Sequence, residues 1–214
     1  MKKALIVQGG WPGHQPRETA GIIAHDLRQA GFDIELSDTL DSLLDEARLK
    51  TLSLIVPHWT MGQITAEQSA GLRAAIESGV GLGGIHGGMG DAFRSDTAFQ
   101  FMTGGQFVAH PDDHKDYLVW IVKKADPIVA GLADFAVHSE QYYLHVDPAN
   151  EVLATTIFQT ASAPWINGTV MPVVWKRQHG AGRVFYSAIG HDTKDLAVPE
   201  VREITKRGLA WAAR

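Results

Sequence analysis

The feature that most constrains the fold is a regular alternation of short apolar runs and amphipathic stretches in the first half of the chain. The apolar run 4–8 ends at two glycines, and residues 16–30 then carry apolar side chains at helical spacing. Strand-like runs follow at 32–36, 52–57 and 80–85. Strands that alternate with helices across short turns predict a mostly parallel sheet covered on both faces.

Two more helices are expected between these strands. Residues 41–49 have a helical pattern, and residues 65–78 open with a Thr-x-x-Gln capping pattern, Thr65 and Gln68, before Gly79. We therefore predict an α/β fold with a flavodoxin-like, doubly wound sheet.

The second half of the chain is richer in strands. Strand-like runs occur at residues 117–122, 152–157, 170–175 and 183–189. Gly180 and Gly182 suit a hairpin turn that needs positive φ, and residues 198–213 form a closing helix. A chain of 214 residues is long enough for one large core, and it contains no repeat or linker. We expect a single domain over residues 1–214, with the later strands as additions.

Charge and hydropathy limit the class of partner. The net charge is −5 and the basic residues are scattered, which argues against nucleic acid or anionic lipid as a partner. No apolar run approaches the about 18 residues that cross a bilayer. We expect a cytoplasmic protein whose partner is a small molecule. The absence of cysteine excludes disulfides, thiolate metal sites and thiol nucleophiles.

Histidines follow several of the predicted strands. In open parallel sheets, ligands bind beyond the carboxyl ends of the strands, so these positions are the first site candidates. The candidates are His14, His58, His86, His110 and His191. A lone histidine at a strand end is more often structural, so the hypothesis depends on several of them converging. We expect His25 and His179 to be solvated.

The turn Gly84-Ile85-His86-Gly87-Gly88 has the spacing of a nucleophile elbow, in which glycines relieve crowding around a strained residue. With His86 at its centre it cannot serve a serine or cysteine hydrolase. An anion site at this turn is the alternative, but the chain lacks a phosphate-loop lysine and a complete dinucleotide fingerprint. We predict no nucleotide.

Glu140 is the most suggestive carboxylate. Aromatic neighbours such as Tyr142 can desolvate it and raise its pKa, as a general base requires. The alternative is an edge strand with alternating polar faces. Trp11 and Trp59 near strand ends are candidates for stacking on sugar rings, or for the core. Asp112, Asp113, His114 and Asp116 form a polar cluster that we expect to be a solvated loop rather than a metal site, which is the alternative.

A divalent metal such as zinc is a further expectation, with His86, His110 and His191 as its ligands. Imidazole nitrogens suit zinc, although no His-x-x-x-His or His-Glu-x-x-His motif is present. His14, His58, Tyr142 and Trp59 are then expected to contact substrate.

Taken in order, several motifs resemble the ThuA-like, or trehalose-utilisation, family, whose fold is that of class I glutamine amidotransferases. The matching segments are Gly9-Gly10 with His14, residues 81–88, residues 104–111, residues 126–132, Glu140 before two tyrosines, residues 172–175 and residues 182–192. The resemblance implies a homodimer or higher homo-oligomer, a role in carbohydrate catabolism and a functional link to a sugar oxidoreductase. The family pattern has an acidic residue before the glutamate, where this chain has Ser139.

From the residues and the resemblance together we expect an enzyme that acts on a carbohydrate, such as an oxidised (keto) sugar derived from a trehalose-type disaccharide. The activity would be of the isomerase, lyase or hydrolase type, with His86 and Glu140 as acid/base groups. The alternative is a non-catalytic sugar-binding or regulatory module. Glutamine amidotransferase activity is excluded because the thiol is missing.

Overall fold

The computed structural model describes residues 1–214, and its first half forms parallel strands at the predicted places in the sequence. These strands are β1 (Lys2–Gly10), β2 (Phe32–Ser37), β3 (Leu54–Thr60) and β4 (Gly81–Ile85). β11 (Gly182–Ser187) returns from the end of the chain to pair in parallel with β4. The side chains of β3 and β4 are almost all buried, as expected for strands covered on both faces.

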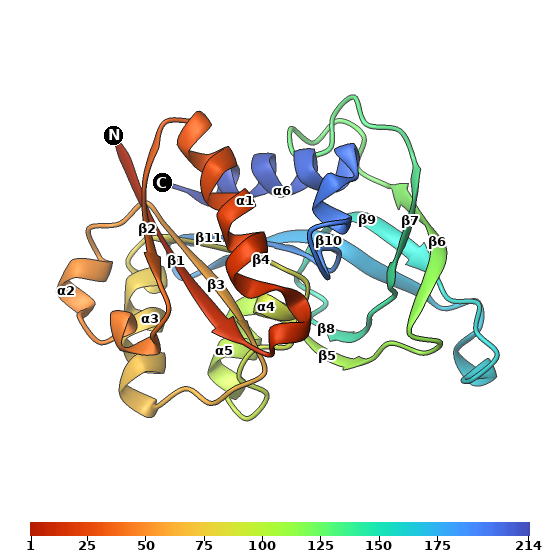
Figure 1. The fold of residues 1–214 in the computed structure, drawn as a ribbon, viewed down its shortest axis with the longest axis horizontal. Coiled ribbons are helices and arrows are strands. Elements are labelled where there is room, and N and C mark those ends of the chain that lie inside the picture. The colour runs from red at the N-terminus through yellow and green to blue at the C-terminus, as the bar shows by residue number, and fades with distance from the viewer.

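The predicted strand-rich additions continue the same sheet with antiparallel pairs. They are β10 (Val170–His179), β9 (Glu151–Ile157), β6 (His114–Ile121) and β7 (Phe135–Glu140). The nine-stranded order is β2-β1-β3-β4-β11-β10-β9-β6-β7, so the sheet as a whole is mixed (Figure 1). A separate two-stranded sheet pairs β5 (Gly105–Ala109) with β8 (Tyr143–Val146).

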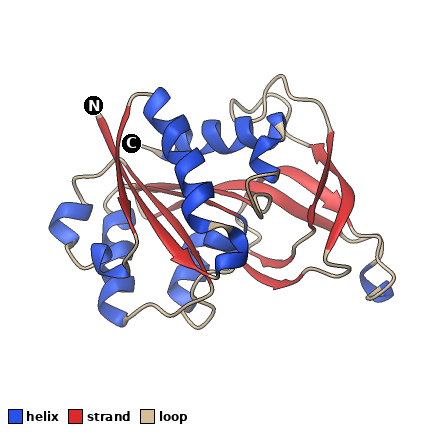
Figure 2. Cartoon of the chain, in the orientation of Figure 1, coloured by secondary structure: helices blue, strands red, loops and turns tan.

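Helices cover both faces of the parallel half (Figures 1 and 2). α1 (Pro16–Gln29) packs beside α6 (Pro199–Ala212), and α3 (Ala66–Glu77) packs beside α2 (Glu46–Leu49) and α5 (Thr97–Thr103). The short α4 (His86–Gly90) follows β4 directly. A side chain at Gly83 would meet Leu209 of α6, whereas one at Gly84 would meet Met89 of α4, so adjacent residues of β4 face the two helical layers.

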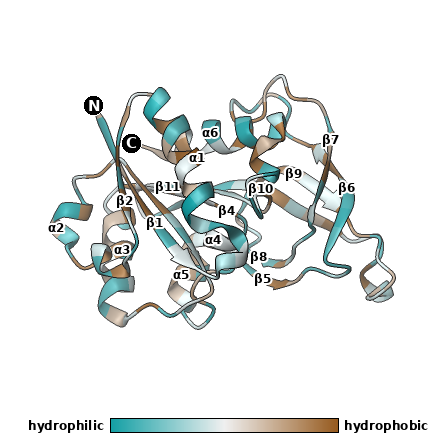
Figure 3. Cartoon of the chain, in the orientation of Figure 1, coloured by the Kyte–Doolittle hydropathy of each residue, from teal (hydrophilic) through white to brown (hydrophobic).

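One hydrophobic core joins the two halves of the chain. It contains 53 buried residues and runs from Leu5 in β1 to Val174 in β10 without a break. Hydrophobic colour concentrates on the central strands, while α2 is mainly hydrophilic (Figure 3). None of the helices combines the length and the apolarity needed to cross a membrane.

The structure agrees with some of the predicted local features and differs from others. The capping box of α3 is confirmed, because Thr65 and Gln68 exchange side-chain-to-backbone hydrogen bonds. The helix expected over residues 41–49 is wrong: a 3₁₀ turn at Leu40–Leu43 is followed by α2, which begins anew where the Asp45 carboxylate accepts from the Arg48 amide. In the hairpin between β10 and β11 only Gly180 has positive φ, at 58°, and Gly182 already pairs as a strand residue.

Candidate active site

Three of the predicted histidines and Glu140 meet at one point. His14, His86 and His191 follow β1, β4 and β11, whose carboxyl ends lie at the same edge of the sheet. Glu140 is the last residue of β7 and comes from the antiparallel half. The four side chains are buried, and their ligand atoms all lie within 4.8 Å of one another.

One oxygen of Glu140 is the centre of this cluster. Oε2 lies 3.0 Å from Nε2 of His86, 3.2 Å from Nδ1 of His191 and 3.8 Å from Nε2 of His14. The His191 nitrogen is close but misaligned, so this buried atom makes no hydrogen bond. Three imidazoles therefore surround a single carboxylate oxygen.

The tautomer of His86 follows from its second contact. Nδ1 lies 2.8 Å from the carbonyl oxygen of Ala188, which can only accept, so Nδ1 carries a proton. In the neutral ring, Nε2 then presents a lone pair to the Glu140 carboxylate at 3.0 Å. Two acceptors at this distance repel unless a cation or a proton lies between them.

The turn that carries His86 has the strain expected of an elbow. His86 has φ of 45°, in the left-handed region, which costs a residue with a side chain about 1–2 kcal/mol. A side chain at Gly88 would lie 2.7 Å from Nδ1 of His58, and one at Gly90 would collide with the Tyr186 hydroxyl. The glycines therefore allow His86 to sit on this turn in close contact with its neighbours.

Burial and mutual contacts set the charges of the cluster. Burial raises the pKa of Glu140, but polar contacts with His14, His191 and His86 outweigh it and hold that pKa well below its usual range. Burial lowers the pKa of His86 to about 4, although contact with Glu140 opposes this shift. For His191, burial lowers the pKa, but Glu140 and Asp195 overcome it and raise the pKa overall. We therefore assign an ionised Glu140 beside a neutral His86.

Surrounding residues hold the cluster in place. Nδ1 of His14 lies 2.7 Å from the Thr60 hydroxyl, and the ring of Tyr142 stacks on His86 with centroids 4.0 Å apart. The buried carboxylate of Asp195 accepts from the Ser139 hydroxyl at 2.6 Å and from the His191 amide at 2.8 Å. Ser139 thus ties the strand of Glu140 to the loop of His191.

Two members of the cluster, His14 and Glu140, line a cavity of about 310 Å³. The rest of its lining combines apolar side chains, which include Trp11, Phe107 and Tyr142, with the ionisable side chains of Asp91, Arg94, His110 and Asp113. The Trp11 ring is 42% exposed, which leaves its face available to a ligand. A cavity of this size that combines aromatic surface with several polar groups suits a small, polar ligand.

His58 and Trp59 do not line this cavity, in contrast to the substrate contacts expected of them. His58 lies within β3 rather than beyond it, and its Nε2 is 2.7 Å from the Thr19 hydroxyl. Burial, followed by the nearby His14 and His86, lowers the pKa of His58 to about 4. Trp59 points to the other face of the strand and packs over Gly9.

The metal ligands expected from sequence do not come together as one set. His110 lies on the far side of the carboxylate, with Nε2 3.7 Å from Oε1 of Glu140, and His14 takes its place beside His86 and His191. Asp113, from the polar cluster expected to be a solvated loop, lies beside His110.

The remaining expectations concern isolated residues. Asp112, Asp113, His114 and Asp116 are exposed as expected, although the last two belong to β6. His25 is exposed, as predicted. The prediction for His179 is wrong: its side chain is only 11% exposed, because it packs edge-on against Phe101 and lies 3.6 Å from Glu77.

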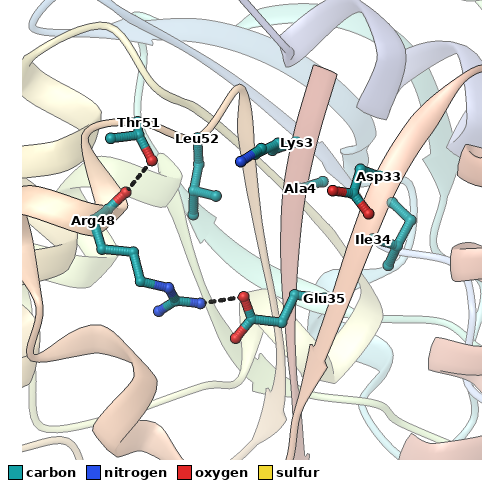
Figure 4. Close-up of a pocket in the computed structure, with 8 residues that line it drawn as sticks. All are labelled: Lys3, Ala4, Asp33, Ile34, Glu35, Arg48, Thr51 and Leu52. Carbon is teal, nitrogen blue, oxygen red and sulfur yellow. Dashed lines mark hydrogen bonds and ion pairs between the residues drawn. The ribbon is translucent and has the colours of Figure 1, made fainter. Parts of the chain in front are cut away.

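A larger cavity of about 480 Å³ lies at the opposite end of the sheet, among the amino ends of β1 and β2 (Figure 4). Two of its charged side chains, Arg48 and Glu35, pair with one another. No histidine lines it. The chemistry of the molecule is therefore concentrated at the carboxyl ends of the strands.

Sequence reasoning missed several supporting residues. Thr60 lies 46 residues from His14, which it contacts, and Asp195 lies 56 residues from Ser139, so no local pattern pairs them. One local signal could have pointed to Asp195: two acidic residues, Asp192 and Asp195, follow a strand end, and acidic side chains in such loops often accept hydrogen bonds from backbone amides. Asp195 does so from the amides of Gly190 and His191.

Comparison with solved structures agrees with this architecture. A ThuA-like protein of Parabacteroides merdae superposes with a TM-score of 0.80 at 17% identity, covering 99% of this chain and 89% of that one. A ThuA-like protein of Bacteroides uniformis superposes with a TM-score of 0.79 at 18% identity, covering 99% of this chain and 91% of that one. A cytoplasmic protein of Salmonella typhimurium superposes with a TM-score of 0.65 at 14% identity, covering 100% of both chains.

No curated protein matches the chain. The family model for ThuA, trehalose utilisation, matches residues 3–212, which is nearly the whole sequence. The chain therefore belongs to the ThuA family, which is linked to the use of trehalose in carbohydrate metabolism.

Proposed function

We propose that this protein is a metal-assisted enzyme of carbohydrate catabolism, acting by proton transfer on a sugar or an oxidised (keto) sugar such as a trehalose-type disaccharide derivative. A divalent cation such as zinc is held by His14, His86, His191 and Glu140. The observation that carries the proposal is the approach of two acceptors, Nε2 of His86 and Oε2 of Glu140, to 3.0 Å in a buried site.

The donor set fits zinc in number and chemistry. Zinc binds nitrogen and oxygen ligands at about 2.0–2.2 Å, which places tetrahedral ligand atoms about 3.3 Å apart. Oε2 lies 3.0 and 3.2 Å from the nitrogens of His86 and His191, close to this spacing, whereas the His14 nitrogen, at 3.8 Å, would have to move closer. The carbonyl of Ala188 and the hydroxyl of Thr60 contact the other ring nitrogens of His86 and His14, as second contacts of metal-bound histidines usually do.

The position of the cluster supports a ligand site. Counting β11 as the fifth parallel strand, the order β2-β1-β3-β4-β11 is the 2-1-3-4-5 order of flavodoxin-like sheets. Ligands in such sheets bind where the strand order reverses, between β1 and β3, and His14 and Thr60 lie there.

A bound cation would polarise a carbonyl or hydroxyl oxygen of the sugar, which would have to enter as a fifth ligand because four protein ligands fill a tetrahedral site. Trp11 and Phe107 line the cavity and offer apolar surface to a sugar ring. The carbohydrate substrate, the link to a sugar oxidoreductase and a homo-oligomeric assembly rest on the family.

A metal-free acid/base enzyme is the second candidate, and the state of His191 favours it. The raised pKa of His191 beside an ionised Glu140 gives a proton donor and a proton acceptor in one site. Metal analysis of the active protein separates the two candidates, because only the first requires a cation for turnover.

The test is turnover of a panel of disaccharides and their keto derivatives, followed by NMR, with zinc-loaded protein. We expect Glu140→Gln and His86→Ala to abolish turnover while the folded circular-dichroism spectrum is kept, and the exposed-site control His25→Ala to retain it. Full turnover by Glu140→Gln would refute the assignment. Sugar binding by the wild type without any turnover would instead identify a binding module.

A further inference from the structure

The carboxylate of Glu140 faces a different set of ligand atoms with each of its two oxygens. Oε2 faces the buried histidines, whereas Oε1 lies 3.7 Å from Nε2 of His110. The ligand atoms of His110, Asp113 and Glu140 all lie within 4.8 Å of one another. We infer that this second set binds a second divalent cation, so that Glu140 bridges two metal ions. The inference rests on the proposed function, because it takes the first cation to be present at Oε2.

The second set differs from the first in donor chemistry. It offers one imidazole and two carboxylates, and hard cations such as Mn²⁺ and Mg²⁺ prefer such oxygen-rich sites. No lysine or arginine pairs with Asp113, whose contact partner is His114 at 3.1 Å. The Asp113 carboxylate is therefore available to a cation without displacing a lysine or an arginine.

The loop that carries Asp113 is fixed by its neighbour. Asp112 and Asp113 both have positive φ, at 69° and 57°. The Asp112 carboxylate accepts from the Ser162 hydroxyl at 2.6 Å and from the Lys115 ammonium at 3.1 Å. These contacts hold the backbone of the turn, so Asp113 faces His110 without a change of fold.

The second set is more open than the first. The His110 side chain is 37% exposed and that of Asp113 is 76% exposed, and both line the cavity of about 310 Å³ together with Glu140. Three protein ligands leave coordination positions free on the cavity side for substrate oxygens. A bridging carboxylate places two metal ions about 3.5–4 Å apart, which suits a substrate with two neighbouring oxygens.

The two sites predict two classes of binding. Four buried ligands should hold zinc tightly, whereas three partly exposed ligands should hold Mn²⁺ more weakly and exchange it. The test uses metal-free full-length protein, loaded first with one equivalent of Zn²⁺ and then titrated with Mn²⁺, with free Mn²⁺ followed by electron paramagnetic resonance.

We expect wild-type protein to retain one Zn²⁺ and to bind one Mn²⁺ more weakly. His110→Ala and Asp113→Asn should each weaken Mn²⁺ binding about tenfold or more and leave Zn²⁺ bound. The control Asp116→Asn, at an 89% exposed carboxylate on β6, should change neither.

The outcomes separate the inference from the proposed function. Zinc binding without any Mn²⁺ uptake, or Mn²⁺ uptake that both variants leave intact, overturns the second site and leaves the first standing. A wild type that retains no zinc overturns both. Circular dichroism of each variant confirms that the loss is not one of folding.

Discussion

Replacing Gly87 with alanine should displace His14 from the cluster without altering any ligand. Gly87 is the second residue of α4, and a Cβ there would lie 2.7 Å from Nδ1 of His14 and 3.0 Å from the Thr60 methyl group. Cε1 of the same ring would be closer still, and ordinary contact begins at 3.4 Å, so the ring must retreat by about 1 Å. That movement breaks or stretches the 2.7 Å hydrogen bond between His14 and Thr60.

The expected change in the free energy of unfolding of Gly87→Ala is the sum of opposing effects. Overpacking costs about 1–3 kcal/mol, and loss of one buried hydrogen bond costs about 1 kcal/mol. Alanine regains about 1 kcal/mol of helix propensity. We therefore expect Gly87→Ala to lower the free energy of unfolding by about 1–3 kcal/mol and to weaken zinc binding about 10–100-fold.

Urea unfolding and calorimetric zinc titration measure the two effects. Gly21→Ala is the matched control, because Gly21 lies in α1 with open space around its Cβ position. The control should raise the unfolding free energy by about 0.5–1 kcal/mol and leave zinc binding unchanged. Wild-type zinc affinity in Gly87→Ala would refute the placement of His14.

Three further changes test other parts of the structure. The pKa of His58 is lowered to about 4 in the folded protein, so below pH 6.5 the unfolded chain binds a proton that the folded chain does not. Between pH 7 and pH 5 the free energy of unfolding should therefore fall by about 2 kcal/mol more in wild type than in His58→Gln. Equal losses of the two proteins in urea unfolding would contradict this. Asp195→Asn should loosen the His191 loop and weaken zinc binding about tenfold, which calorimetry measures; unaltered affinity would show that Asp195 does not position His191. Trp11→Ala should weaken the binding of a sugar ligand by about 1 kcal/mol, because Trp11 lines the cavity. The control Trp165→Ala, at a residue that is 81% exposed and lies outside the cavity, should leave the binding unchanged. An equal effect of the two variants would exclude stacking on Trp11.

The parallel half of the fold was predictable because its signals are local. Apolar runs, glycine stops and the capping box at Thr65 each specify an element without reference to the rest of the chain. The antiparallel pairing of the second half depends on contacts between distant segments, such as β6 with β9, which no local pattern records.

The candidate site was predictable to the extent that it follows strand ends. His14, His86 and His191 meet because parallel strands deliver them to one edge of the sheet. Trp59 was misplaced because the face of a strand changes with each residue, and a shift of one position turns a side chain to the other layer. The position of His110 depends on the separate sheet of β5 and β8, which the sequence pattern did not reveal.

The proposed zinc centre of His14, His86, His191 and Glu140 is tested most directly by zinc X-ray absorption spectroscopy of the zinc-loaded protein. The structure predicts a first shell of nitrogen and oxygen at about 2.0–2.1 Å that contains three imidazole rings, falling to two in His191→Ala. Retained zinc with fewer than two imidazoles in the wild type, or a spectrum unchanged in His191→Ala, would contradict the proposed metal centre.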